Sequence, residues 1–417
     1  MSAAVATPKV IAYATLTGTG LLAAVVLGEV GVVALVLPFA VALVIGLMSP
    51  VGTLPEVSLE IDTSRLVEGG QATVSVLVSP TGPTSRCDLA LGVPDGLEVQ
   101  GPRQWALALK PGSPVLIEVP LTASFYGRFV IGPATVRVRG PFALRARSGA
   151  LGAVVALQVR PRPAALRSLT RALEVRPTAG DRLARQPGDG IEFAEVRPYT
   201  AGSPGRLNWR VTARHGEPYV NLRHPERSTD VVLLVDTFAA AVLPRQVRAT
   251  AGLAAAYLAR HDRVGLVAFG GILHWVEPAM GQAQLERIIA ALTTTRWHHS
   301  YAWKTAEAIP PRTLPATGLV IALSPLEDAR MVNALASIRA RGVDLAVIET
   351  IGSPPQRRRS EAGQIAARII SLEHAEVRDN LARRGVPVIA WREGEPLETS
   401  LGALATWRRR ARGRVAR

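Results

Sequence analysis

The sequence predicts a multidomain protein in which a transmembrane α-hairpin is followed by a β-sandwich and then by a doubly wound α/β domain. Two long uncharged apolar runs lie within the first 50 residues, and short alternating segments with turn signals fill residues 55–160. From residue 230 onward, continuous apolar runs alternate with helical patterns. We therefore divide the chain into a hairpin, a sandwich, a linker with a distinctive motif and an α/β domain, with bounds 1–50, 51–160, 161–229 and 230–417.

The chain has 417 residues, which suggests two or three domains at roughly 100–200 residues per domain. Hydrophobic residues make up 48% and charged residues 19%, a composition that excludes wholesale disorder. The lone cysteine, Cys87, excludes an intramolecular disulfide framework and any zinc or iron–sulfur site that needs several cysteines. A lone thiol also fits a reducing compartment.

The net charge of +15 first suggests nucleic-acid binding. However, only three of the 48 basic residues are lysines, and the rest are arginines. This bias, together with abundant Ala, Gly, Val and Pro, is typical of a GC-rich coding genome rather than of a binding surface. We therefore expect no specific nucleic-acid binding.

Val10–Leu27 and Val30–Met48 contain no charged residue and are separated only by Gly28 and Glu29. A helix of about 20 apolar residues crosses the hydrocarbon layer of a membrane, so each run is long enough. Helices are the expected form because backbone polar groups must be paired in lipid. The sequence therefore predicts a transmembrane hairpin. A signal peptide fits poorly, because it would not contain the second apolar run.

The two ends of a hairpin lie on the same side of the membrane, together with the basic remainder of the chain. Lys9 and Arg65 flank the apolar runs, whereas the connecting turn carries Glu29 and no basic residue. The positive-inside bias therefore predicts a protein of the cell (plasma) membrane with residues 50–417 in the cytoplasm.

The middle of the chain alternates with period two. Residues 57–61, 72–78 and 135–139 show this pattern, and pairs such as Gly69-Gly70 provide turn signals between the runs. The pattern predicts an antiparallel sandwich. Residues 55–160 hold no histidine and no clustered carboxylates, so we expect a spacer or binding module rather than a catalytic domain.

An Arg- and Pro-rich linker at residues 160–187 precedes the most distinctive string of the chain, which spans residues 190–214. The characteristic residues are Gly190, Glu192, Phe193, Arg197, Tyr199, Gly202, Arg206, Trp209, Ala213 and Arg214. On these residues the sequence resembles the domain-of-unknown-function 58 family, whose string is roughly Gly-x-Glu-Phe, x-x-x-Arg-x-Tyr and Gly-Asp-Asp-x-Arg-x-Ile-Asp-Trp-x-x-x-Ala-Arg. The match is long and spaced, and is therefore specific.

The resemblance implies a bacterial membrane-anchored protein with paired N-terminal membrane helices, an Ig-like middle and a von Willebrand factor A-like domain. Such proteins are often encoded beside a MoxR-type AAA+ ATPase, which is then the expected partner. The chain departs from the family where acids are expected, because Ser203-Pro204 replaces Asp-Asp and Asn208 replaces Asp. Polar function at these positions is expected to be weakened or altered.

Two interpretations of the motif remain open. Trp209 and Phe193 offer apolar area for burial, and nearby arginines can pair with Glu192 and Glu195 in a clamp that ties the linker to the next domain. Alternatively, the arginines form a basic surface that receives a partner protein or a phosphate. The arginines are Arg197, Arg206, Arg210 and Arg214.

The C-terminal part alternates strands and helices. Val231–Val235 and Leu319–Leu323 are typical of strands buried on both faces, and Gly270-Gly271 indicates a hairpin between two more strands. One antiparallel hairpin in a doubly wound sheet resembles the von Willebrand factor A fold. The remaining predicted strands are Val264–Phe269, Ile272–Val276, Asp344–Ile348 and Pro387–Ala390. The predicted helices are Arg245–His261, Gln282–Leu292, Ala329–Arg341, Ser360–Arg384 and about Leu397–Arg410.

Asp236 follows the first of these strands, where open α/β sheets bind ligands. The metal motif of the fold is Asp-x-Ser-x-Ser with a distant Thr and Asp, but here Phe238 and Ala240 replace both serines. After the second buried strand the chain reads Ser324-Pro325-Leu326, and the acid Asp328 comes later. Because Mg²⁺ needs about six oxygen ligands, we expect a degenerate site with no metal and no cofactor.

Two further groups of residues each have a structural and a functional interpretation. His298-His299 lies among Trp297, Tyr301 and Trp303, and we expect a packing or contact loop rather than a metal site. Arg357–Arg359 and the tail Arg408–Arg417 are solvated charge runs or contacts to the anionic cytoplasmic leaflet. The sequence contains no phosphate-binding loop and no Gly-x-Ser-x-Gly elbow, which argues against an NTPase or a serine hydrolase.

Together these features predict a non-enzymatic, membrane-anchored scaffold or adaptor that binds a protein partner. Two alternatives stay open. One is a metal-dependent or hydrolytic protein that uses Asp236, Asp328 and His298 or His299 at the strand ends. The other is an anionic-lipid or nucleic-acid binder that acts through its arginine runs.

Overall fold

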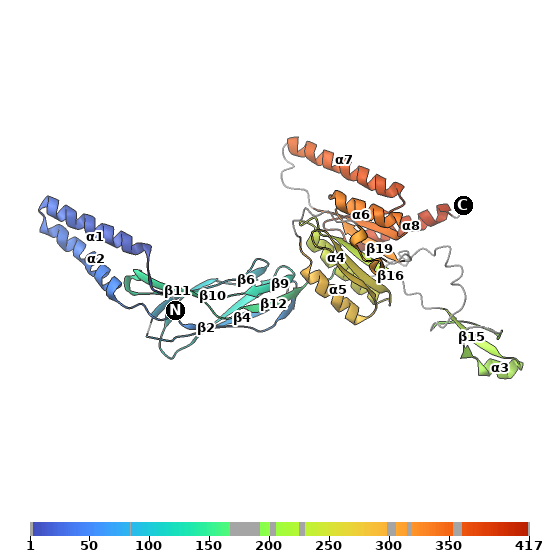
Figure 1. Cartoon of the computed structure of the whole chain (residues 1–417), viewed down its shortest axis with the longest axis horizontal. Coiled ribbons are helices and arrows are strands. Elements are labelled where there is room, and N and C mark those ends of the chain that lie inside the picture. The colour runs from blue at the N-terminus through green and yellow to red at the C-terminus, as the bar shows by residue number, and fades with distance from the viewer. Residues whose placement is uncertain are drawn as a thin grey trace. The chain divides into compact units, whose positions relative to one another are not determined.

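The computed structural model describes residues 3–83, 85–166, 192–200, 206–224, 230–297, 306–314, 318–352 and 361–415. The chain divides into two compact units, Met1–Arg162 and Pro163–Arg417. The first unit contains two apolar helices and several β-sheets, and the second contains a small sheet and a larger α/β domain (Figure 1). The predicted multidomain organisation is therefore confirmed.

The first unit begins with a helical hairpin. Helices α1 (Pro8–Leu27) and α2 (Val30–Met48) coincide with the two predicted apolar runs and pack against each other. Gly28 ends α1 with φ at 67°, a left-handed conformation that glycine adopts without strain. Gly20 leaves room for the Val36 side chain, so the helices approach closely. Both helices are long and apolar enough to cross a membrane.

Short strands make up the rest of the first unit, and the predicted runs at 57–61, 72–78 and 135–139 lie within them. The strands are β1 Val5–Ala6, β2 Glu56–Ile61, β3 Arg65–Val67, β4 Gln71–Ser79, β5 Ser85–Leu91, β6 Leu97–Val99, β7 Gln104–Leu109, β8 Val115–Ala123, β9 Gly127–Ile131, β10 Ala134–Arg139, β11 Arg145–Leu151 and β12 Val155–Arg160. Among the described residues they form sheets in the orders β1-β11-β10-β5-β7, β2-β4-β8-β6 and β3-β12-β9.

The three sheets face a shared hydrophobic core. Strand β10 shows why: Ala134, Val136 and Val138 are fully buried, and the residues between them are exposed. This period-two burial requires one face of each sheet to meet another apolar layer. Val74 and Val76 of β4 lie in the same core as the β10 valines, although the two strands belong to different sheets.

The second unit contains a small sheet built from part of the family motif. Strands β13 (Glu192–Pro198) and β14 (Arg206–Leu207) both pair antiparallel with β15 (Tyr219–His224). The short helix α3 (Trp209–His215) connects β14 to β15 and ends at Gly216. The residues predicted as part of a linker therefore include a local β-α-β structure.

The larger part of the second unit is a sheet with strand order β18-β17-β16-β19-β20-β21. All described neighbours pair in parallel except β17 and β18, which form the predicted antiparallel hairpin. The strands are β16 Asp230–Asp236, β17 Arg263–Phe269, β18 His274–Ala279, β19 Leu319–Ser324, β20 Asp344–Ile351 and β21 Val388–Arg392. The buried apolar runs of β16 and β19 confirm the prediction of strands covered on both faces.

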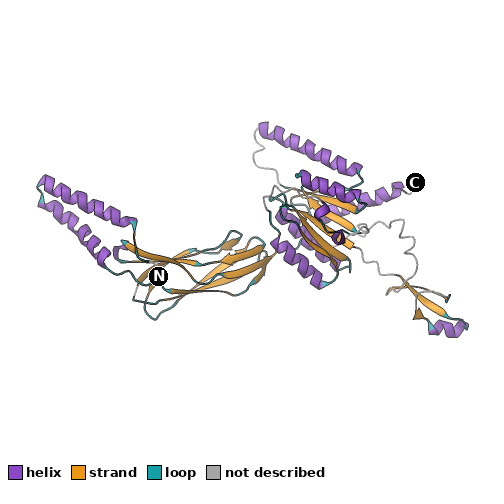
Figure 2. Ribbon diagram, in the orientation of Figure 1, coloured by secondary structure: helices purple, strands orange, loops and turns teal. Residues whose placement is uncertain are grey.

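Helices cover both faces of this sheet (Figure 2). Even-numbered residues of β16 and β19, such as Val232 and Val320, share a core with Met331 and Leu335 of α6. Helix α4 contacts β16 and packs on α5. The helices are α4 Leu243–Leu258, α5 Gln282–Thr294, α6 Ala329–Ala340, α7 Glu361–Arg383 and α8 Leu397–Val415, which confirms the predicted helices to within a few residues at most ends.

Candidate functional site

The strand order reverses between β16 and β19, and open α/β sheets bind ligands at the carboxyl edge of such a point. Asp236 ends β16 and Ser324 ends β19. The parallel register places Val235 opposite Leu323, so the next residues of the two strands are also neighbours. Both side chains lie on the face that carries Val232 and Val320, because strand residues alternate with period two.

Asp236 is fully buried, and both of its carboxylate oxygens accept hydrogen bonds. The Ser324 hydroxyl donates to Oδ2 at 2.6 Å, and the Phe238 backbone N–H donates to Oδ1 at 2.9 Å. The Ser324 hydroxyl oxygen in turn accepts the Leu326 N–H at 2.9 Å. Asp236 therefore ties the loops after β16 and β19 together through one continuous chain of hydrogen bonds.

Burial raises the pKa of Asp236 to about 6. The hydrogen bonds from Ser324 and from the Phe238 N–H lower this pKa and offset part of the effect, while the nearby charges of Asp328 and Glu327 raise it. Asp236 therefore exchanges its proton within the range of pH at which cells work, although solvent does not reach it in this conformation.

The loop after β16 carries Phe238, which stands where the metal motif has a serine. The Phe238 ring meets Phe269 edge-on at 5.8 Å, and the Arg330 guanidinium lies 4.1 Å from the Phe238 ring centroid. The indole N–H of Trp297 donates to the Phe238 carbonyl at 3.0 Å. Phe269 and Arg330 thus hold the Phe238 ring and Trp297 holds its backbone carbonyl, and the side chain at this position offers no oxygen ligand.

A close approach at the end of β17 holds the same loop in place. The Thr237 N–H donates to the Phe269 carbonyl at 2.9 Å, and the Thr237 side chain lies against Gly270. A Cβ at Gly270 would collide with the Thr237 backbone at 2.9 Å as well as with its side chain. Gly270 is therefore needed for packing, in addition to its place in the predicted hairpin turn.

Asp328 has a different environment from Asp236. Its carboxylate caps α6 by accepting the Arg330 N–H at 2.8 Å, and it forms an ion pair with the Arg330 guanidinium at 2.7 Å. The side-chain hydrogen bond from Arg330 is the main cause that lowers the pKa of Asp328. Asp328 therefore stays ionised while Asp236 holds a proton more tightly, and each acid already has its own partner.

The enzymatic alternative needs histidines beside these acids, but His298 and His299 lie outside the described residues, as do Tyr301 and Trp303. Within the described ranges, no three His, Cys, Asp or Glu side chains come together as a metal site.

A second buried carboxylate was missed by the sequence analysis. Glu349 near the end of β20 is buried, and His374 Nδ1 and Arg378 Nη1 of α7 approach its carboxylate oxygens at 3.3 and 3.2 Å. The two partners are four residues apart, so they share one face of the helix. An acid within a buried apolar strand was the signal that could have revealed this site.

The described motif residues form a polar network of their own. Asn208 caps α3 by accepting the Val211 N–H at 3.2 Å, and its amide donates to Asn221 at 2.7 Å. An aspartate could not donate the second bond, so asparagine alters the polar role at this position rather than removing it. The Thr212 hydroxyl oxygen also accepts the Tyr219 N–H at 2.9 Å, which fixes α3 against β15.

The expectation that Trp209 is buried is wrong for the described chain, because its side chain is 72% exposed. Tyr199, Arg210 and Arg214 are exposed as well. Helix α3 has only two turns, and its polar contact to β15 is made by Thr212, while the Trp209 side chain lies outside.

The arginine–carboxylate clamp stays a prediction. Gly190 and Gly202 lie outside the described residues, as do Ser203-Pro204, Arg357–Arg359 and the side chains of Glu192, Phe193, Glu195, Arg206 and Arg408–Arg417. Arg197 is described, and its side chain is partly buried.

No curated protein sequence matches this chain. Among solved structures, the chain is similar to the cupredoxin domain of amoB from Nitrosocaldus yellowstonii, at 9% identity and a TM-score of 0.20, over 29% of this chain and 97% of that one. It is also similar to a cohesin module from a Clostridium perfringens family 33 glycoside hydrolase, at 14% identity and a TM-score of 0.19, over 26% and 97% of the two chains. Native alpha-2-macroglobulin from Escherichia coli shows 16% identity and a TM-score of 0.22, over 37% and 22%.

The profile of one protein family covers both the motif sheet and the Asp236 site. It is described as "Protein of unknown function DUF58", and it matches residues 195–349. The matched segment begins within β13 and ends at Glu349 in β20, so it includes Arg197, Trp209, Asp236 and Ser324. The resemblance inferred from the motif is thereby confirmed over residues 195–349, which match the DUF58 family model.

Proposed function

We propose that this protein is a membrane-anchored, non-enzymatic scaffold that binds a protein partner, a MoxR-type AAA+ ATPase. The two apolar helices supply the anchor in the cell membrane. The strand order with one antiparallel edge hairpin supports a von Willebrand factor A-like assignment for the α/β domain. The sheets that share one core support an Ig-like spacer between the anchor and the binding domain.

The observation that carries the proposal is the closed crevice at the switch point. A metal-dependent binder or a hydrolase needs polar groups that are open to a ligand. Here both oxygens of Asp236 accept hydrogen bonds from the chain itself, and Phe238 replaces the neighbouring hydroxyl ligand. We therefore assign partner binding to side chains outside this crevice.

The exposed residues of the motif sheet provide such a surface. Trp209 is the most exposed of its large side chains, and Tyr199, Arg210 and Arg214 are also accessible. Trp, Tyr and Arg are the residue types that most often dominate the binding energy of protein interfaces. This exposure favours the partner-binding interpretation of the motif over a purely internal clamp.

The test is direct binding of the full chain in lipid nanodiscs to a purified MoxR-type ATPase from the same genome. Binding should persist in magnesium, in EDTA and in high salt. Trp209→Ala should weaken it by about thirtyfold or more, the effect of a hot-spot side chain worth about 2 kcal/mol. Trp275→Ala, at an exposed tryptophan of β18, is the matched control and should change little. Asp236→Asn should also leave affinity unchanged.

Loss of binding in EDTA would instead support the metal-dependent alternative at Asp236. A steep loss of binding with increasing salt would indicate that the arginine runs make the main contacts of the interaction. Equal weakening by the Trp209 and Trp275 variants would remove the motif sheet from the interface.

A further inference from the structure

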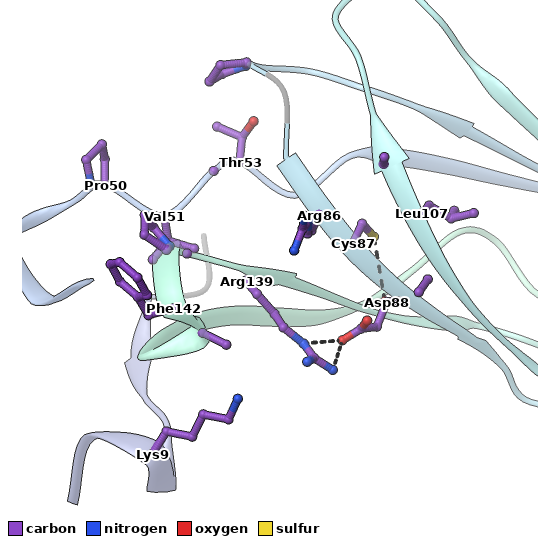
Figure 3. Close-up of a pocket in the computed structure, with 17 residues that line it drawn as sticks. Lys9, Pro50, Val51, Thr53, Arg86, Cys87, Asp88, Leu107, Arg139 and Phe142 are labelled. Atoms are coloured by element: carbon purple, nitrogen blue, oxygen red, sulfur yellow. Dashed lines mark hydrogen bonds and ion pairs between the residues drawn. The ribbon is translucent and has the colours of Figure 1, made fainter. Parts of the chain in front are cut away.

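A pocket of about 1060 Å³ lies in the first unit, where the helical hairpin joins the β-sheets. It is lined by the beginning of α1, the segment that follows α2, strands β5 and β7, and the turn between β10 and β11 (Figure 3). The lining therefore comes from segments far apart in the sequence, which meet only at this end of the sheets.

The hairpin is fixed to the sheets beside this pocket. Val5 and Ala6 of β1 pair with β11, and the Thr7 hydroxyl donates to the Ala143 carbonyl at 2.7 Å. The Arg145 guanidinium donates to the Leu47 carbonyl at 3.0 Å, near the end of α2. Contacts at both ends of the hairpin thus hold the pocket at the level where the two apolar helices stop.

This level corresponds to the polar headgroup region if the hairpin spans a membrane, because each helix is just long enough for the hydrocarbon layer. The inference below therefore rests on the membrane anchor of the proposed function. It does not rest on the ATPase partner, since the pocket lies entirely within the first unit.

The charge of the pocket is positive. Lys9, Arg86 and Arg139 line it, and Asp88 is the one acidic residue among its lining residues. The Arg139 guanidinium pairs with Asp88, at 2.6 Å from Nε and 2.5 Å from Nη2 to the same carboxylate oxygen. Asp88 therefore orients Arg139, and Figure 3 marks this pair with dashed lines in the pocket that Lys9 and Arg86 also line. Within the described chain Lys9 and Arg86 have exposed side chains and form no ion pair.

The lining of the pocket also includes apolar residues of the turn between β10 and β11. Phe142 is half exposed, and Phe142 and Ala143 both adopt left-handed conformations, with φ of 54° and 55°. Such conformations are costly for residues other than glycine, and they persist only where the surroundings enforce them. Here the turn adds an aromatic ring to a lining that also holds three basic residues, a combination suited to a molecule with a charged head and an apolar body.

We propose that this pocket binds the phosphate headgroup of an anionic membrane phospholipid. Lys9 and Arg86 supply the free positive charges, Arg139 is held in place by Asp88, and Phe142 lies against the apolar part of the lipid. Basic pockets at the cytoplasmic membrane surface recognise anionic headgroups through this chemistry. The headgroup would also hold the first sheet at a fixed distance from the bilayer, because the pocket is continuous with the hairpin.

The experiment uses the full chain in nanodiscs of phosphatidylcholine with and without phosphatidylglycerol, and native mass spectrometry counts the lipids that remain bound. Wild-type protein should retain phosphatidylglycerol in preference to phosphatidylcholine. Lys9→Gln and Arg86→Gln should each reduce this retention by about fivefold, the effect expected of one basic residue near a lipid surface. Arg103→Gln removes an exposed arginine outside the pocket and is the matched control.

Equal retention of both lipids by wild type, or equal losses in all three variants, would overturn the proposal. Inorganic phosphate that displaces phosphatidylglycerol completely would also overturn it, because the pocket would then recognise free phosphate rather than a lipid. Extraction of the wild type from membranes by alkaline carbonate would show that the anchor itself is wrong. A carbonate-resistant protein without lipid preference would refute the pocket alone.

Discussion

At the scale of single residues, two acids at the carboxyl edge of the α/β sheet, Asp236 and Asp328, have different surroundings. Asp236 is fully buried, and this burial raises its pKa to about 6. Asp328 lies at a helix N-terminus and pairs with Arg330, so its pKa falls below the ordinary range. The two acids therefore contribute to stability with opposite dependence on pH.

The first prediction concerns Asp236. Its folded pKa of about 6 lies above the value of an unfolded aspartate, so the folded chain keeps this proton longer. The contribution of Asp236 to the free energy of unfolding should then be highest below about pH 4 and fall as the pH rises through 6, by roughly 3 kcal/mol for a shift of about two units. In the Asp236→Asn variant, the free energy of unfolding should decrease less over this pH range. Hydrogen exchange of β16 and β19 amides, corrected for intrinsic rates, measures it in the full chain.

Asp328→Asn is the control, because the contribution of Asp328 to stability changes with pH in the opposite direction. A lowered folded pKa gives stability that is present above the unfolded pKa and is lost as the pH falls, so this variant should weaken the edge at neutral pH. If the stability of the Asp236→Asn variant changed with pH as steeply as that of the wild type, this would contradict the burial argument.

At the scale of elements, one polar contact attaches helix α7 to the sheet, and packing along the length of the helix contributes less. Its first half leaves Ile365, Ile369 and Leu372 exposed, so it gains little from packing there. Its second half holds Leu381 in the core of the sheet, and His374 and Arg378 meet Glu349. The buried carboxylate of β20 is therefore the main polar tie between this helix and the sheet.

The second prediction follows from that contact. Arg378→Ala leaves Glu349 buried, and the imidazole of His374 is then its remaining side-chain contact among the described residues. We expect the amides of residues 374–383 to exchange about tenfold faster, since a hydrogen bond to a buried charged group is worth about 1.5 kcal/mol. Hydrogen exchange of the full chain measures the change. Arg383→Ala, an exposed arginine of the same helix, should leave the rates unaltered, and an equal effect of the two variants would show that helix propensity alone is responsible.

At the scale of the whole molecule, the chain has two compact units, and the first begins with a short apolar hairpin. The positive-inside bias predicts which side of the membrane those units occupy. The lone cysteine makes this orientation measurable, because Cys87 is 1% exposed and its pKa is raised to about 11, chiefly by burial. A buried neutral thiol reacts slowly with maleimides.

The third prediction is therefore a labelling pattern in intact cells. A membrane-impermeant maleimide should label Glu29→Cys, in the turn of the hairpin, and should spare Thr63→Cys and the wild type. After the membrane is permeabilised, Thr63→Cys should label as well, because its site is partly exposed. The reverse pattern would place the two units outside the cytoplasm. Labelling of the wild type in the folded state would show that Cys87 is more accessible than its burial indicates.

Local patterns account for most of the fold that could be predicted. Two uncharged runs gave the hairpin helices nearly to the residue, and the periods of 2 and 3.6 residues gave the element types of both units. The spaced motif led to the DUF58 family, which the match over residues 195–349 confirms. Each of these features depends on residues close together in the chain.

The sequence by itself thus determined the element types, the hairpin and the family, together with the position of Asp236 at a strand end. Tertiary structure decided the rest, since Ser324 and Asp236 are 88 positions apart, and Glu349 meets α7 only through the sheet order. It also decided the exposure of Trp209 and the gathering of Lys9, Arg86 and Arg139 around one pocket. Periodicity specifies which face of an element is buried, whereas contacts between distant residues follow from register and strand order, which only the assembled sheets fix.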